Sequence, residues 1–100
     1  MYSRLLEDLS RAVGARMLIR FGYGDETYIV EPHLLGSNKH NEDCLCAWLD
    51  SKYASGKKAG WHCFLFSDMK DVELLDDRFS RERPGYDPYN NAMNRIYYRL

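Results

Sequence analysis

Apolar residues recur at every second position through much of this chain, and this period constrains the fold more than any other feature. Period-two stretches lie between Met17 and Leu75, separated by short polar segments rich in glycine and serine; residues 44–49, and 61–66 except for His62, are apolar on both faces. Side chains of a β-strand point alternately to its two faces, so the period predicts strands rather than helices. The predicted strands are residues 17–23, 27–30, 44–49, 61–66 and 72–75. Few short strands with tight turns favour a small, mostly antiparallel barrel, because closure removes the unpaired edges of a sheet.

Two features limit these strands. The residues before Met17 carry leucines at helical spacing and predict an amphipathic helix that ends at Gly14. Proline has no N–H to donate to a ladder, so we expect Pro32 to end the second strand and residues 36–42 to form a polar loop.

We expect one domain in three parts. The parts are a helix over residues 1–14 that packs on the barrel, a β-barrel over 15–79 and a carboxy-terminal arm over 80–100. The arm begins with arginine, proline and glycine, which predicts irregular structure. Its apolar spacing over residues 91–100 then predicts a short final helix.

The charge balance argues against a dedicated nucleic-acid binder. Fourteen lysines and arginines stand against fifteen aspartates and glutamates, whereas such proteins usually carry a large basic excess. An odd number of cysteines, three, and an amino terminus without a signal peptide's apolar segment indicate free thiols in a reducing cytoplasm. Apolar runs are far too short to span a membrane. We therefore expect a cytoplasmic protein without a membrane partner.

Four motifs together resemble the WYL domain, a small Sm-like or SH3-like barrel found mostly in bacterial regulators. They are Ile19-Arg20-Phe21-Gly22-Tyr23, Val30-Glu31-Pro32-His33-Leu34-Leu35, Cys44-Leu45-Cys46-Ala47-Trp48, and Phe64-x-Phe66-Ser67-Asp68-Met69 followed by Val72, Leu74, Leu75 and Phe79. The resemblance covers roughly residues 15–79 and implies a bacterial ligand-sensing or regulatory domain. At 100 residues the chain has no room for the DNA-binding or enzymatic domain that usually accompanies a WYL domain, so we expect a stand-alone member.

The resemblance also implies a class of ligand. Basic residues of WYL domains are thought to meet anionic ligands such as nucleotides or single-stranded nucleic acid. At the positions of those arginines this chain carries Tyr28, His62, Leu65 and Asp68, and only Leu45 remains of the Trp-Tyr-Leu that names the family. The expected ligand is nucleotide-like or anionic, and whether nucleic acid binds is left open.

The leading functional prediction is a non-catalytic binding module that uses no cofactor and holds its ligand on one wall of the barrel. The residues predicted to line that wall are Tyr23, His33, Trp48, His62 and Lys70. Aromatic and imidazole rings can stack on a heterocycle, and lysine can meet its anionic group. The alternative for Trp48 is that its ring is a core anchor of the barrel.

The arm favours a second and different function. Its tyrosines alternate with arginines, a mixture enriched at the energetic centres of protein interfaces. The candidate contacts are Arg81, Arg83, Tyr86 and Tyr89. On this interpretation the chain is a protein-interaction or oligomerisation module, and its partner is another protein or a second copy. The arm could equally pack back over the open end of the barrel, and the two interpretations are compatible.

Cysteine and histidine raise two further hypotheses, a zinc site and a thiol enzyme. Cys44 and Cys46 share one face of a predicted strand, but zinc needs four converging ligands, and His62 and Cys63 point to opposite faces of the next strand. His33 or His62 could act as the base for a thiol nucleophile, but nothing in the sequence places a helix N-terminus or an orienting acid beside these cysteines. Buried structural thiols are the default, so we predict neither a metal site nor an enzyme.

Overall fold

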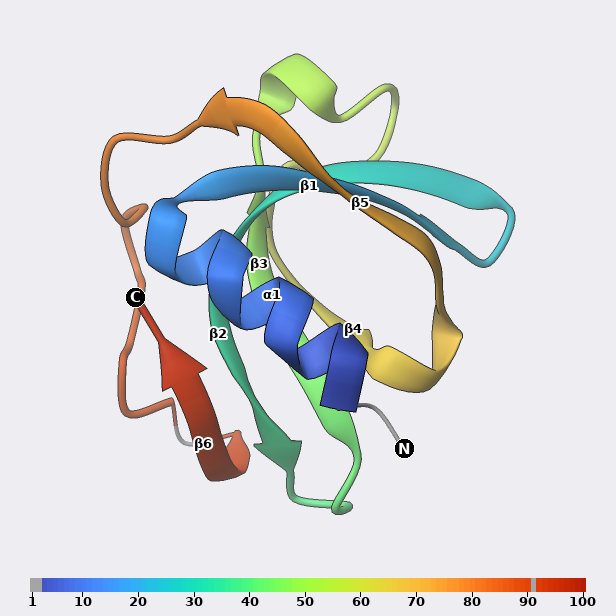
Figure 1. Cartoon of the computed structure of the whole chain (residues 1–100). Helices are drawn as coiled ribbons and strands as arrows, with labels where there is room; N and C mark the ends of the chain where they lie inside the picture. The colour runs from blue at the N-terminus through green and yellow to red at the C-terminus, as the bar shows by residue number, and fades with distance from the viewer. Residues whose placement is uncertain (1–2, 91) are drawn as a thin grey trace.

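Six antiparallel strands and one amino-terminal helix make up the part of the chain that the structure describes, residues 3–90 and 92–100. The structure is a computed structural model, and it is mainly β (Figure 1). Its elements are α1 (Ser3–Ala15), β1 (Met17–Tyr23), β2 (Glu26–Asn38), β3 (Asp43–Leu49), η1 (Ser51–Tyr53), β4 (Gly60–Leu65), η2 (Phe66–Asp68), β5 (Met69–Arg78) and β6 (Met93–Arg99). The strands pair in the order β4-β3-β2-β1-β5, and β6 pairs with β2 outside that path. The first two residues of the predicted helix over 1–14 lie outside the described part.

Strand β2 is longer than the sequence predicts, because Pro32 bends it without ending it. The predicted strand end at Pro32 is wrong: this residue lies opposite Ala47 of β3, and the pairing register shifts directly after it. The bulge leaves the next residue, His33, without a partner on β3, and proline is tolerated in a strand beside a bulge of this kind. Residues 36–38 consequently belong to β2, and the loop predicted over 36–42 is confined to 39–42.

The sheet is curved but open, so the prediction of a closed barrel is wrong in this respect (Figure 1). The first half of β2 pairs with β1 and the second half with β3 and β6. The end strands β4 and β5 are joined through η2, and their described residues do not pair with each other. The backbone N–H of Leu65, the last residue of β4, instead donates to the hydroxyl of Tyr23 on β1 at 3.0 Å. The Tyr23 side chain thus accepts a hydrogen bond that, in a closed barrel, the backbone of a neighbouring strand would accept.

The main core lies between α1 and the concave side of the sheet. The helix crosses in front of β2 and β3 (Figure 1) and buries Leu9, Ala12 and Val13. The strand side chains that are completely or almost completely buried include Ile19, Phe21, Val30, Leu45, Leu49, Phe64 and Phe66. Each such side chain contributes about 1.5–3 kcal/mol on leaving water. The alternation noted in the sequence therefore has its cause here, since one face of each strand meets this core.

Helix α1 continues past Gly14, so the helix end predicted at that glycine is wrong. The residue that leaves the helix is Arg16, which has a φ of 57° and donates its N–H to the carbonyl of Val13 at 3.2 Å. Gly14 makes room for a neighbour, because a Cβ there would lie 2.9 Å from the hydroxyl oxygen of Tyr98 on β6. Within the described residues, no helix combines the length and the apolar character that crossing a membrane requires.

The predicted helix over residues 91–100 is also wrong, because this segment forms strand β6 (residue 91 itself lies outside the described part). It pairs antiparallel with the second half of β2, at the edge that β3 does not use. Its branched and aromatic residues, Ile96, Tyr97 and Tyr98, suit a strand. Close pairing depends on Gly36, since a Cβ at that position would overlap the carbonyl oxygen of Arg95. Pairing with the free edge of β2 therefore determines the conformation of this segment, although the spacing of its apolar residues also suits a helix.

Candidate functional site

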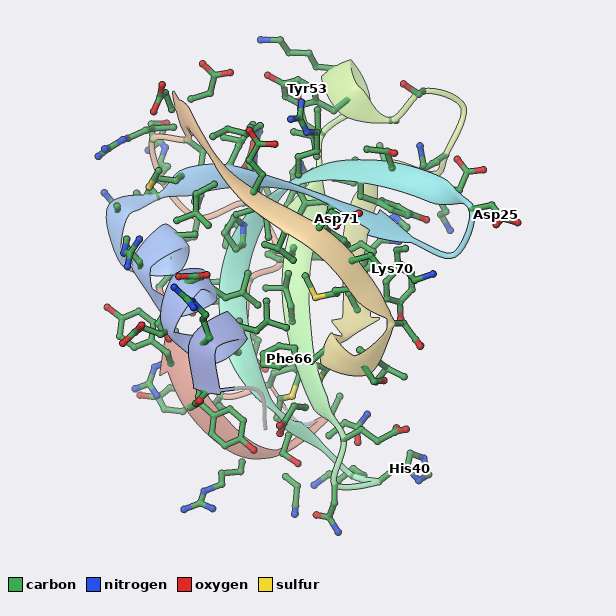
Figure 2. The ribbon with its side chains drawn as sticks, turned by 45° about the vertical axis from the view of Figure 1, so that its right-hand side comes forward. Asp25, His40, Tyr53, Phe66, Lys70 and Asp71 are labelled. Carbon is green, nitrogen blue, oxygen red and sulfur yellow. The ribbon has the colours of Figure 1, made fainter. Side chains whose placement is uncertain are left out.

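The five residues predicted to line one ligand wall do not share a surface. Tyr23 and His62 lie on the inner side of the sheet and pack on Phe64, with ring centroids 5.0 Å and 5.8 Å from it. The Nε2 of His62 also donates to the carbonyl of Lys58 at 2.6 Å. Lys70 is exposed on β5, beside Asp71 (Figure 2). Tyr23 and His62 are therefore separated from His33 and Trp48, which lie on the opposite face.

His33 and Trp48 belong to a cluster of rings between the outer face of the sheet and the arm. The imidazole of His33 stacks on Phe79 at 5.1 Å and meets Trp61 at 4.9 Å and Tyr86 at 5.3 Å. The indole of Trp48 packs edge-on against Trp61 at 5.4 Å. We call these five residues the ring cluster. Because the arm supplies Tyr86, the cluster is complete only when the arm is folded against the sheet.

His33 is the residue of the β2 bulge that has no partner on β3, and its side chain is completely buried. The backbone N–H of Arg83 donates to its Nε2 at 3.1 Å, so Nε2 carries no proton. The proton sits on Nδ1, which donates to the carbonyl of Glu31 at 2.8 Å. Burial lowers the pKa of His33, opposed in part by that hydrogen bond. His33 is a neutral, satisfied core histidine rather than a side chain free to bind a ligand.

Arg83 fixes the arm through its charge. Its Nε and Nη2 donate to the two carboxylate oxygens of Glu31 at 2.8 Å and 2.7 Å, and Nη2 lies 3.5 Å from Asp50. The guanidinium also lies over the ring of Trp48, 5.7 Å from its centroid. The hydrogen bond to Glu31 raises the pKa of Arg83, so this charge is permanent. Two-pronged geometry of this kind orients the arginine as well as binding it.

Two further hydrogen bonds hold the arm in place. The indole N–H of Trp61 donates to the carbonyl of Pro84 at 2.9 Å, and the hydroxyl of Tyr86 donates to the carbonyl of Leu100 at 3.2 Å. Gly85 has a φ of 86°, and a Cβ there would lie 3.1 Å from the Trp61 indole nitrogen. Positive φ and close approach explain why glycine stands between these two anchors.

The four arm residues predicted to contact a partner therefore divide into two pairs. Arg83 and Tyr86 are engaged inside the molecule, where they hold the arm against the sheet. Arg81 is exposed, and Tyr89 is 72% exposed with the guanidinium of Arg99 5.2 Å from its ring centroid. Arg83 and Tyr86 therefore pack the arm on the sheet, and of the four only Arg81 and Tyr89 are available to contact a partner.

A groove of about 1000 Å³ opens between the start of the arm, the end of β5 and η1. We call it the arm groove. Its cationic side chains are Lys52, Arg78, Arg81 and Arg83, and its acidic ones are Glu31, Asp50, Asp77 and Glu82. Tyr53, which projects from η1 in Figure 2, and the buried ring of Phe79 supply apolar surface. Of the predicted sites, this groove includes only Arg81 and Arg83.

A second, smaller cavity of about 250 Å³ contains a pair of thiols. Cys46 on β3 and Cys63 on β4 are direct cross-strand partners, and their Sγ atoms are 3.2 Å apart. The side-chain amide of Asn90 in the arm donates to the Sγ of Cys46 at 3.7 Å. Cys46 is buried, whereas Cys63 is exposed. We call this cavity the thiol pocket.

The three thiols differ in acidity. Burial raises the pKa of Cys44 to about 11. The hydrogen bond between the paired sulfurs stabilises a thiolate at the exposed Cys63 and lowers its pKa to about 7. The same hydrogen bond, with burial, raises the pKa of Cys46. Across residues 3–90 and 92–100, no three His, Cys, Asp or Glu side chains are grouped so that they could hold a metal ion.

No family model, no curated protein and no solved structure matches this chain. Two of the features described above are absent from the sequence predictions, the pairing of Glu31 with Arg83 and that of Cys46 with Cys63. Opposite charge and matching thiol chemistry were the only signals, and neither fixes which residues meet. The function therefore has to be argued from the geometry of the two cavities.

Proposed function

We propose that this chain is a non-catalytic regulatory binding module of the WYL type, acting in the cytoplasm, which takes a small nucleotide-like anion in the arm groove. The carrying observation is a groove of about 1000 Å³ in which Lys52, Arg78 and Arg81 have no ion-pair partner among the described residues. Sites for small molecules are usually clefts of about 300–1000 Å³ with a few placed polar groups. The groove has the size and the polar groups that such a ligand needs.

The charges of the groove favour a small anion over a long one. The groove has four cationic and four acidic side chains, and both Glu31 and Asp50 lie against Arg83, so Lys52, Arg78 and Arg81 are the cations that an anion can meet. A long polyanion would need a large excess of basic residues along its path. Three cations in a groove without net charge are better matched to one or two phosphate groups. Cation and ring also adjoin here, since the Lys52 ammonium lies 5.5 Å from the ring centroid of Tyr53. In a nucleotide, the flat base could stack on the Tyr53 ring while the phosphate meets the Lys52 ammonium.

Titration of AMP, ATP and a short oligothymidine strand, followed by tryptophan fluorescence and by calorimetry, tests this proposal. Trp48 is a suitable reporter because Arg83, which lines the groove, lies over its ring. We expect saturable binding of the mononucleotides that the double variant Arg78→Gln/Arg81→Gln weakens at least tenfold. The matched control is Arg4→Gln/Arg95→Gln, two exposed arginines outside the groove that give the same net charge.

Either of two results would refute the proposal. One is the absence of a response to every nucleotide by both methods, and the other is an equal loss of affinity in the control. Tight binding of the oligothymidine strand with a steep dependence on salt would show a nucleic-acid ligand instead.

A second candidate is a protein-interaction or oligomerisation module that uses the end of the arm. Three of the four exposed large apolar side chains of the described residues, Tyr89, Tyr97 and Tyr98, lie in the last twelve positions. Arg95 and Arg99 accompany them on β6. Tyrosine and arginine are the residue types enriched at interface hot spots, which supports this candidate.

Light scattering over a range of protein concentrations tests the second candidate. We expect mass to rise with concentration, and Tyr89→Ser to abolish the rise, whereas Lys39→Ser in the loop after β2 should leave it unchanged. A monomer at every concentration, with no partner retained by the immobilised protein, would argue against it. Deleting the arm would not test assembly alone, because it would also remove Arg83 and Tyr86, whose hydrogen bonds hold the arm against the outer face of the sheet.

A further inference from the structure

The thiol pocket brings together two groups that can react with each other, and it does so independently of the arm groove. Cys46 and Cys63 face each other across antiparallel strands, with their sulfurs in hydrogen-bonding contact at 3.2 Å. Cα atoms of such partners are about 4.5–5.5 Å apart, which falls within the range of about 4.4–6.8 Å seen in disulfides. The backbone therefore already has the geometry that a bond between the two sulfurs requires.

We propose that Cys46 and Cys63 form a reversible oxidation site, at which a small hydroperoxide converts the two thiols to a disulfide. The thiol pocket, of about 250 Å³, gives the peroxide access to the exposed Cys63. The buried Cys46 lies directly behind it as the resolving thiol. Reactive thiols of this kind are exposed and have a second cysteine close by.

The chemistry takes two displacement steps. The Cys63 thiolate attacks one oxygen of hydrogen peroxide, the O–O bond breaks, and the departing hydroxide takes a proton to become water. The Cys46 sulfur then attacks the sulfur of the resulting Cys63 sulfenic acid, the S–S bond forms, and the S–O bond breaks. The Cys46 proton leaves with the second hydroxide as water. Overall two thiols lose two hydrogen atoms, and one hydrogen peroxide becomes two waters.

The environments of the three cysteines select this pair. A thiolate is the reactive form, and the pKa of Cys63 near 7 makes it abundant at neutral pH. Cys44 is buried, its thiol contacts the Met93 sulfur at 3.7 Å, and its cross-strand partner is Leu65 rather than a cysteine. Cys44 therefore has neither access to the peroxide nor a thiol opposite, and it serves as an internal control.

Mass spectrometry of the full chain treated with one equivalent of hydrogen peroxide tests the proposal. We expect the intact protein to lose the mass of two hydrogen atoms, peptide mapping to join Cys46 to Cys63, and dithiothreitol to reverse the change. Cys44→Ser should behave in the same way. Cys46→Ser should stop at a sulfenic acid on Cys63 that dimedone traps, and Cys63→Ser should react at least tenfold more slowly.

A second measurement, on the untreated proteins, tests the proposal even if one of the variants fails to fold. Phenylarsine oxide, which binds neighbouring thiol pairs, should label the untreated wild-type protein and Cys44→Ser once per chain, but neither of the other variants. Far-ultraviolet circular dichroism confirms that each variant is folded. Addition of oxygen without loss of hydrogen in the wild-type protein, a disulfide that involves Cys44, or a disulfide only between chains would overturn the proposal.

Discussion

The guanidinium of Arg83 meets the carboxylate of Glu31 through two parallel hydrogen bonds, of 2.8 Å and 2.7 Å, although 52 residues separate them in the chain. Glu31 lies on β2 beside the bulge and is only 4% exposed, whereas Arg83 belongs to the arm and is partly exposed. A carboxylate buried this far needs a cation, because its desolvation is otherwise uncompensated. The arm thus supplies the charge that β2 requires.

Loss of Arg83 should be costly for this reason. Breaking a buried ion pair by removing one partner costs about 3–5 kcal/mol, and the partial exposure of Arg83 puts Arg83→Ala near the lower end of that range. Urea denaturation measures the change in the free energy of unfolding. The neighbouring exposed Arg81→Ala should change it by about 0.5 kcal/mol or less. The double variant Glu31→Gln/Arg83→Met should lose less than Arg83→Ala, and a greater loss would contradict an unpaired carboxylate as the cause.

Stability should also fall in mild acid because of His33. Burial lowers the pKa of His33 below its unfolded value of about 6.5, so between these two values the unfolded chain binds a proton that the folded protein does not. The free energy of unfolding is therefore highest above about pH 6.5 and decreases below it, by at most about 1.4 kcal/mol per pH unit. Denaturation at pH 7.5 and 5.5 measures the effect. His33→Gln removes the titrating group and should reduce the difference; an unchanged difference would assign it to other residues.

A methyl group at Gly36 should displace β6, since a Cβ there would overlap the Arg95 carbonyl oxygen. Overpacking of this kind costs about 1–3 kcal/mol. The matched control is Gly22→Ala on β1, where the nearest atom to a Cβ would be 3.7 Å away, and its effect should stay within about 0.5 kcal/mol. Hydrogen exchange should show faster exchange of β6 amides in Gly36→Ala alone. Equal protection of β6 in both variants would mean that the backbone adjusts without loss of pairing.

The two tryptophans should respond differently to replacement by phenylalanine. Trp61 donates its indole N–H to the Pro84 carbonyl at 2.9 Å, whereas the buried indole nitrogen of Trp48 has no hydrogen-bond partner in the described residues. Trp61→Phe should lose about 1 kcal/mol from that bond alone and loosen the arm. Trp48→Phe should lose less, because it removes an unsatisfied donor along with ring contacts. Urea denaturation and limited proteolysis of the arm compare them; a costlier Trp48→Phe would give the larger role to its contact with Arg83.

The spacing of apolar residues in the sequence correctly predicted the strands whose side chains are buried in the core. The alternation over Met17–Tyr23 corresponds to β1, and the apolar run over residues 44–49, apolar on both faces, corresponds to most of β3, which is buried on both sides. The prediction failed for β6, where residues 91–100 also satisfy a helical spacing. Pairing along an edge of β2, permitted by Gly36, decided that segment. Such an interaction depends on residues far apart in sequence and leaves no local period.

The candidate site was harder to predict for the same reason. The bulge at His33 moves the side chains that follow it to the other face, so strict alternation from Val30 would place Leu34, which lines the thiol pocket, in the main core instead. The pairing of Cys46 with Cys63 depends on the register of two strands joined by a long loop, and the loop does not set it. The residue types indicated the chemistry, whereas the register determined which of them meet.

The hydroxyl of Tyr23 accepts the N–H of Leu65 at the point where β1 and β4 come together without a ladder. Because a side-chain hydrogen bond, rather than a ladder, joins β4 to β1 here, the two strands can separate while every ladder of the sheet stays intact. We expect the local openings of lowest free energy to begin at this contact. Such an opening would bring water to the ring of Phe64, which Tyr23 covers. The weakest contact of this sheet therefore lies where the last residue of β4 meets β1, rather than within any of its ladders.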